Sequence, residues 1–318
     1  MRRFVKLLVA ALLSAVVSAN VLAFMQARAM TRFIESGERT AGPEQLSLFE
    51  KLAVIFSGVS IPRPRNLLTP AQHQLPFSTH RLVNASGESL EAWYVAGNAG
   101  APVVLMFHGY GASKSTLLAT AQAFHALGYS TLLVDFYGSG GSSGSGTSIG
   151  VKESDDVAAA FAYAKKSWPR SKIILYGISM GGAAVLRAMA VNGIKPDGAI
   201  VEATFDRLLN AGKSRLRAMG LPVSPFAQLL LFWGSVQLGV NLFTHNPADY
   251  AASVKAPTLV LHGERDARAT LADARRIAAA LGACGRFMSF AGVPHMAIVD
   301  ARREAWLTAV GAFLAELQ

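Results

Sequence analysis

The chain has one cysteine, Cys284, in 318 residues, so no disulfide can form within it. Cys284 lies in the small-residue segment Gly282–Gly285, without a second cysteine or a histidine at ligand spacing. This isolation argues against a zinc site and against a disulfide framework. The composition also lacks the biases of collagen, repeat arrays or disordered chains. About half of the residues are apolar, which is enough to bury one large core.

Long clusters of basic residues are absent too, although the net charge is +10. The lysines and arginines are scattered along the chain and are not interleaved with aromatics on one segment. Nucleic-acid binding is therefore disfavoured. A positive surface also suits an anionic membrane face.

Charge is missing from Leu7–Met25, which follows Arg2, Arg3 and Lys6. A signal peptide also has basic residues followed by an apolar run, and the chain could be cleaved after Ala23. The length favours a membrane anchor, since about 20 apolar residues cross a bilayer. We therefore predict a single span within residues 1–30 in the cell inner membrane, with the remaining chain outside the cytoplasm. Cleavage after Ala23, giving a secreted or periplasmic protein, is the alternative.

Residues 31–76 are predicted to connect this segment to a domain over residues 77–318. Within the connector, Glu44–Phe56 has apolar residues at helical spacing and is expected to pack on the core or to lie at the membrane surface. The domain begins with two alternating segments, His80–Asn84 and Ser89–Val95, that predict an antiparallel hairpin.

From there apolar strands alternate with helices, which predicts an α/β fold with a mostly parallel, doubly wound sheet. The candidate strands are Val103–Phe107, Ser130–Val134, Lys172–Tyr176, Gly198–Val201, Thr258–Leu261 and Arg286–Phe290. Residues 205–250 are too long for a simple crossover. They predict either a small helical cap over a site or a helix on the sheet edge.

Gly177-Ile178-Ser179-Met180-Gly181 lies between a predicted strand and a predicted helix. This context is the one that a Gly-x-Ser-x-Gly nucleophile elbow requires. The flanking glycines allow strand and helix to approach closely, and the strained turn exposes the hydroxyl of Ser179. Ser179 is therefore the candidate nucleophile.

A serine needs a base, and the base needs an acid, in the chain order serine, acid, histidine. His295 follows the last predicted strand, where catalytic groups gather in an open α/β sheet. It is favoured over His245, in the insertion, and over His262, at a strand end.

The candidate acid is Asp266, just beyond the strand Thr258–Leu261. Glu264 and Glu202, which also lie at strand ends, are its rivals. Asp135 precedes the serine and is better explained as a structural carboxylate.

Two backbone N–H groups are candidates for an oxyanion hole. One belongs to Met180, which begins the helix after the serine, and the other to Tyr110, in the turn His108–Gly111. His108 itself is expected to order this turn. The glycine-rich segment Gly138–Gly146 lacks the Gly-Lys-Ser/Thr ending of a P-loop, so we expect no cofactor, and nothing in the sequence supports a metal.

In these motifs the chain resembles the α/β-hydrolase superfamily, and most of all its bacterial serine hydrolases related to lysophospholipases, monoglyceride lipases and serine aminopeptidases. The resemblance covers about residues 77–318 and rests on five motifs, His108–Gly111, Asp135–Gly140, Gly177–Gly182, Leu261–Asp266 and Pro294-His295. It implies that Ser179 is the nucleophile, Asp266 the acid and His295 the base, with Tyr110 and Met180 as oxyanion donors. One departure is Tyr137, where relatives usually carry arginine.

These observations predict a membrane-anchored serine hydrolase that cleaves a carboxylic ester, small or lipid-like, through an acyl-enzyme. Peptidase or thioesterase activity stays open. An acyltransferase with the same triad and a non-catalytic binding protein are the alternatives. A dehalogenase would carry aspartate in place of Ser179 and is excluded.

Overall fold

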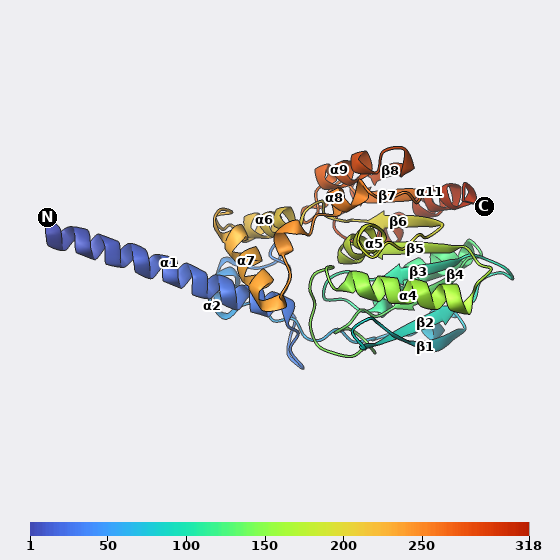
Figure 1. The fold of residues 1–318 in the computed structure, drawn as a ribbon, viewed down its shortest axis with the longest axis horizontal. Coiled ribbons are helices and arrows are strands. Elements are labelled where there is room, and N and C mark those ends of the chain that lie inside the picture. The colour runs from blue at the N-terminus through green and yellow to red at the C-terminus, as the bar shows by residue number, and fades with distance from the viewer. Residues whose placement is uncertain (318) are drawn as a thin grey trace.

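An eight-stranded sheet organises the computed structural model, which describes residues 1–317 (Figure 1). The spatial order of the strands is β1-β2-β4-β3-β5-β6-β7-β8. Their bounds are β1 Phe77–Val83, β2 Ser89–Val95, β3 Val103–Phe107, β4 Ser130–Val134, β5 Ile173–Ile178, β6 Gly198–Glu202, β7 Thr258–Gly263 and β8 Gly285–Phe290. The pairs β1–β2 and β2–β4 are antiparallel and the others are parallel.

The strands form where apolar runs rich in β-branched residues are bounded by turns. Every residue of β3 and of β4 is buried, as expected for strands covered on both faces. The predicted hairpin and the mostly parallel sheet are thereby confirmed, with strand ends that differ from the prediction by a few residues.

Helices cover both faces of the sheet and build two cores. On one face lie α3 (Leu118–Ala126), α10 (Ile298–Ala301) and α11 (Arg303–Ala315), around the fully buried Trp306. On the other lie α4 (Glu153–Ser167), α5 (Met180–Ala190), α8 (Pro247–Ala251) and α9 (Leu271–Leu281). Within residues 1–317 there are also four short 3-10 helices, η1 Pro70–His73, η2 Lys114–Leu117, η3 Leu242–Thr244 and η4 Gly282–Cys284.

The long insertion between β6 and β7 forms two further helices, α6 (Leu208–Met219) and α7 (Phe226–Leu238). They pack on each other, and α7 also packs along the first helix of the chain, α1 (Arg2–Thr31). Figure 1 shows α6 and α7 at the end of the sheet from which α1 projects.

The connector holds a short helix, α2 (Leu48–Ser57), that begins later than the predicted Glu44. Ser47 fixes the start, because its hydroxyl accepts from the Glu50 N–H and the Glu50 carboxylate accepts from the Ser47 N–H. No residue of α2 is buried.

Candidate active site

Ser179 occupies a strained turn between β5 and α5. Its φ of 54° and ψ of −115° are unusual for a residue with a side chain. A Cβ on Gly177 would meet the backbone of Gly181, and one on Gly181 would meet the carbonyl oxygen of Phe107. The two glycines therefore allow the tight turn that leaves Ser179 at the tip, half-buried.

Asp266 and His295 are joined by a short hydrogen bond, with 2.6 Å between Asp266 Oδ2 and His295 Nδ1. The other oxygen, Oδ1, accepts from the N–H groups of Arg268 and Ala269 at 2.8 and 3.0 Å. Asp266 is buried, whereas the His295 side chain is 20% exposed. The carboxylate thus fixes the ring through Nδ1 and leaves Nε2 as the nitrogen available to another group.

The sheet brings these residues to one edge. Ser179 follows β5, Asp266 follows β7 and His295 follows β8, and these strands run parallel with β6 between the first two. The loops after β7 and β8 also contact each other, because the N–H of Arg265 donates to the Val293 carbonyl at 2.9 Å. The three predicted residues therefore share the carboxyl edge of the sheet.

The turn after β3 lies beside the serine. A Cβ built on Gly109 would be 3.6 Å from the Cβ of Ser179. Tyr110 follows in this turn, and Met180 is the first residue of α5. The Tyr110 hydroxyl donates to the Met30 carbonyl at 2.5 Å, and burial raises the pKa of Tyr110 to about 12.

His108 is fully buried and orders the same turn. Its Nε2 accepts from the Phe136 N–H at 3.1 Å, so Nδ1 carries the proton and donates to the Gly109 carbonyl at 2.9 Å. Burial lowers the pKa of His108, which keeps the ring neutral.

The rival acids have other partners. Glu202 is fully buried and accepts from the Ile298 N–H at 2.6 Å and from Trp306 Nε1 and the Tyr176 hydroxyl at 3.1 Å each. Burial raises the pKa of Glu202 to about 7. Glu264 accepts from the hydroxyl of Ser289.

The rival histidines have other partners as well. His262 Nε2 bonds to the carbonyl of Ala269 at 2.9 Å, and its distance to Asp266 Oδ2 is 3.8 Å. His245 is buried beside Tyr250, with 3.3 Å between its Nδ1 and the tyrosine hydroxyl, and burial lowers its pKa to about 3.

Asp135 holds the loops next to the site. Its carboxylate accepts from the N–H groups of Lys114 and Gly141 and forms a fully buried ion pair with Lys114 Nζ. Lys114 and other donors keep the pKa of Asp135 low, although burial alone would raise it. At Tyr137, the position where relatives usually carry arginine, the backbone N–H donates to Asp156 at 2.9 Å.

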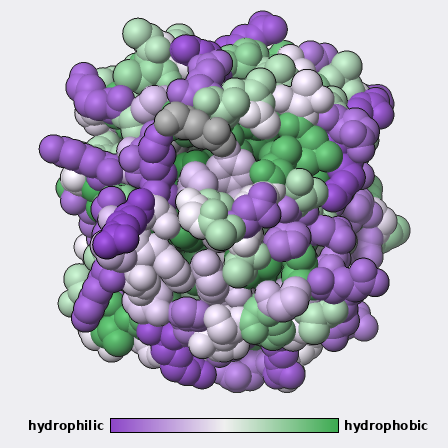
Figure 2. All heavy atoms as spheres, turned by 90° about the vertical axis from the view of Figure 1, so that its right-hand side faces the viewer, coloured by the Kyte–Doolittle hydropathy of each residue, from purple (hydrophilic) through white to green (hydrophobic). Residues whose placement is uncertain are grey.

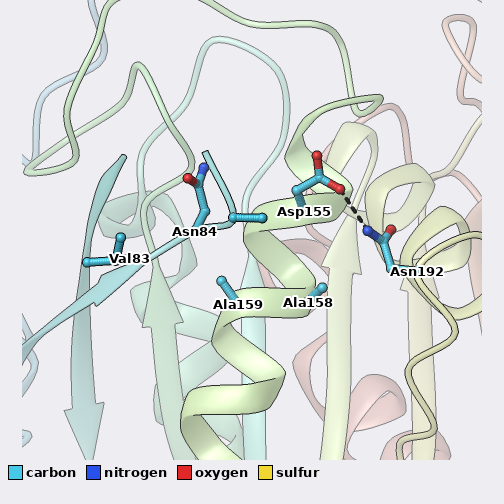
Figure 3. Close-up of a pocket in the computed structure, with 7 residues that line it drawn as sticks. Val83, Asn84, Asp155, Ala158, Ala159 and Asn192 are labelled. Carbon is cyan, nitrogen blue, oxygen red and sulfur yellow. Dashed lines mark hydrogen bonds between the residues drawn. The ribbon is translucent and has the colours of Figure 1, made fainter. Parts of the chain in front are cut away.

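A surface hollow of about 310 Å³ lies elsewhere, between the hairpin and α4 (Figure 3). It is lined by Val83, Asn84, Asp155 and Asn192 among others, and a hydrogen bond of 2.7 Å joins Asn192 to Asp155. These side chains offer no nucleophile. Among residues 1–317 no group of three histidine, cysteine or acidic side chains is placed to hold a metal ion.

Comparison with known proteins identifies the family. A family model described as serine aminopeptidase matches residues 99–250. An uncharacterised protein of Mycobacterium tuberculosis is 30% identical over 236 residues, which cover 72% of this chain and 76% of that protein. The chain belongs to the α/β-hydrolase superfamily. Protein bem46 of Schizosaccharomyces pombe is another relative of this hydrolase, 23% identical over 78% of this chain and 80% of its own length.

Solved structures share the fold of this family member. An esterase of Pyrococcus furiosus superimposes with a TM-score of 0.67 at 21% identity, over 80% of this chain and 96% of the esterase. An esterase of Rhodococcus gives a TM-score of 0.55 at 21% identity, over 76% and 100%. The predicted α/β-hydrolase fold is confirmed.

Proposed function

We propose that this α/β-hydrolase is a serine esterase that works through an acyl-enzyme, with Ser179 as nucleophile, His295 as base and Asp266 as acid. The observation that carries the proposal is the pairing of His295 with Asp266 on the sheet edge where the strained turn of Ser179 ends. Serine, acid and base follow the chain order typical of this fold.

In the first half of the reaction, His295 Nε2 takes the proton of Ser179 as Oγ attacks the carbonyl carbon of the ester. The imidazolium that forms is stabilised by Asp266, which stays ionised and holds the ring through Nδ1. His295 then gives the proton to the departing alcohol oxygen, and the acyl group remains on Ser179.

In the second half, water replaces the alcohol. His295 takes a proton from the water, hydroxide attacks the acyl carbon, and the proton returns to Ser179 as the acid leaves. In each half the carbonyl oxygen becomes an oxyanion, for which the N–H groups of Met180 and Tyr110 are the proposed donors. The dipole at the N-terminus of α5 favours the same negative charge.

The surroundings of Ser179 support an apolar acyl group. Ala183, one turn along α5, belongs to a buried apolar cluster with Leu208 of α6, Leu231 of α7 and Ala269 of the Asp266 loop. This cluster joins the helical insertion to the site. Side chains of this kind favour the hydrocarbon part of an ester over a charged peptide end.

Ser179→Ala tests the proposal. We expect the wild type to react with a fluorophosphonate probe and to hydrolyse p-nitrophenyl esters. Esters of increasing acyl length measure its preference for chain length. The variant should lose labelling and most of its activity. Activity that survives Ser179→Ala would overturn the assignment of the nucleophile, and acyl transfer to an added alcohol in place of water would identify an acyltransferase.

A further inference from the structure

A group of apolar side chains stays uncovered at the base of α1. On α2 they are Leu48, Phe49, Leu52 and Phe56, which lie on one face of a helix that buries none of its residues. Phe49 is 84% exposed. On α7 they are Phe232 and Val236, one turn apart and both exposed. We call these six residues the apolar platform.

Hydrogen bonds hold both platform helices against α1. On one side Trp233 Nε1 donates to Asn20 Oδ1 at 3.1 Å, and Gln237 donates to the Phe24 carbonyl at 2.9 Å. On the other side Gln26 donates to the Val54 carbonyl at 2.5 Å. The second half of α1 is thus clamped between α7 and α2, while its first half is free.

The length of α1 locates this clamp relative to a membrane. The free charge-free part, Leu7–Ala19, extends only about 20 Å at about 1.5 Å per residue. A hydrocarbon core is about 30 Å thick, which the whole charge-free run to Ala27 matches. The clamped residues Asn20–Ala27 must therefore lie within the bilayer when α1 spans it. Arg28 and Arg32, both exposed, then fall at the level of the headgroups.

We propose that the apolar platform is immersed in the bilayer leaflet on the side of the catalytic domain, with the lipids as its occupant. Because α7 contacts α1 at Asn20 and Phe24, a spanning α1 carries α7 into this leaflet. The face remote from α1 differs, since hydrophilic side chains surround the apolar ones there (Figure 2). Six exposed apolar residues around a spanning helix are what a lipid-facing surface requires.

Immersion of the platform also bears on the substrate. This second step of the inference rests on the proposed function. The same end of α1 reaches the site, because the Met30 carbonyl accepts from the Tyr110 hydroxyl. With the apolar platform immersed, α7 lies between the lipid and the apolar cluster around Ala183. The site therefore lies near the level of the headgroups, and the substrate class that fits this position is acyl lipids drawn directly from the bilayer.

Site-specific fluorescence tests the immersion without any catalysis. The full chain with Cys284→Ser receives one cysteine, by Phe49→Cys, Phe232→Cys or, as control, Val191→Cys. Val191 is exposed and follows α5, at the edge of the sheet opposite Ser179. Each variant is labelled with nitrobenzoxadiazole in vesicles of phosphatidylethanolamine and phosphatidylglycerol, with or without doxyl-labelled lipid.

We expect blue-shifted emission and quenching by doxyl lipid for the Phe49→Cys and Phe232→Cys labels, and neither effect for the Val191→Cys label. Water-like emission at both platform positions would overturn the proposal. A blue shift without doxyl quenching would overturn it too, because a protein, such as a second copy of the chain, would then cover the platform.

A second measurement addresses the substrate. The double substitution Phe49→Asp and Phe56→Asp should cause a loss of hydrolysis of a diacylglycerol held in vesicles, while hydrolysis of a water-soluble p-nitrophenyl ester is retained. Equal rates of the variant and the wild type on the vesicle substrate would contradict substrate uptake from the bilayer. Absence of all ester hydrolysis in the wild type would refute the proposed function and leave the fluorescence result standing.

Discussion

Glu202 connects the turn of Ser179 to the segment that follows His295. Its backbone carbonyl accepts from the Ser179 N–H at 2.7 Å, and its carboxylate accepts from Ile298 N–H, three residues beyond His295. One buried residue thus bonds to the serine turn and to the segment after the histidine. Trp306 Nε1 fixes the same carboxylate from α11.

The pKa of Glu202 makes this brace sensitive to pH. In the folded protein the carboxyl holds its proton up to about pH 7, whereas its ordinary value is 4.5. Between about pH 4.5 and about pH 7, unfolding therefore releases a proton from Glu202. As a result the free energy of unfolding falls as the pH rises through this range. Glu202→Gln, which mimics the neutral carboxyl, should remove up to about 3 kcal/mol of this fall, at about 1.4 kcal/mol per pH unit.

The measurement is urea unfolding of wild type and variant in detergent micelles at pH 5 and pH 8. Asp156 has a pKa raised by burial to about 7 and contributes a fall of the same sign in both proteins, so the difference between them isolates Glu202. Parallel pH dependence in the two proteins would contradict a raised pKa at Glu202.

Asp266 and Glu264 provide a matched pair at the same strand end. Asp266→Asn should lower kcat by about 10³–10⁴-fold, because an amide cannot stabilise the imidazolium or fix the ring in the required tautomer. Glu264→Gln should change kcat little, since that carboxylate binds the Ser289 hydroxyl on the outside of the sheet. Steady-state hydrolysis of one p-nitrophenyl ester compares them, and a larger loss with Glu264→Gln would reverse the assignment of the acid.

Among the elements, the connector between α1 and the sheet has an unexpected position, because it wraps the turn after β3. Besides the bond from Tyr110 to Met30, Arg39 donates to the Gly111 carbonyl at 2.5 Å, and Ser113 donates to the Arg65 carbonyl at 3.0 Å. The turn that carries a proposed oxyanion donor is therefore held by residues that precede the first strand of the sheet.

Tyr110→Phe tests this hold. The substitution keeps the backbone N–H but removes the bond to Met30, worth about 0.5–1.5 kcal/mol. We expect kcat to fall by roughly 2- to 10-fold with KM nearly unchanged, since the loss concerns the position of a donor that acts in the transition state. Tyr163→Phe removes a bond of 2.7 Å to His80, far from the site, and is the control. Equal kcat in all three proteins would show that the bond from Tyr110 to Met30 at the end of α1 does not position the turn.

Local patterns predicted the strands well and the contacts between distant segments poorly. The buried strands β3 and β4 are mostly apolar and end at turns, so residues 103–107 and 130–134 can be recognised as strands from the sequence. The partner of Asn20 Oδ1 is Trp233 on α7, 213 positions along the chain, and no periodicity in the sequence indicates that pairing. For the site, positions at strand ends pointed to Asp266 and His295, whose side chains are hydrogen-bonded in the structure. The bonds of Glu202 to α11 depend on the packing of distant segments, which no local pattern indicates.

At the scale of the whole molecule, α1 is both a long apolar helix and a structural part of the domain. It is the one helix among residues 1–317 that is long and apolar enough to cross a membrane. Its last turns are buried at Ala23, Ala27 and Thr31, and the backbone then continues into a bridge between Arg32 and Gly146. A signal peptide is cut at an accessible site, whereas Ala23 is buried where α1 packs against α7.

This burial predicts the fate of the N-terminus. Cleavage after Ala23 would remove Asn20 and the bond it forms with Trp233, and would uncover the side of α7 that α1 now covers. We therefore expect the mature protein to keep residues before Ala23 and to stay in the membrane fraction after carbonate extraction. Mass spectrometry of the purified N-terminal peptide measures this directly. A mature protein that begins at Phe24 would refute the anchor and, with it, the immersion of the apolar platform by a spanning helix.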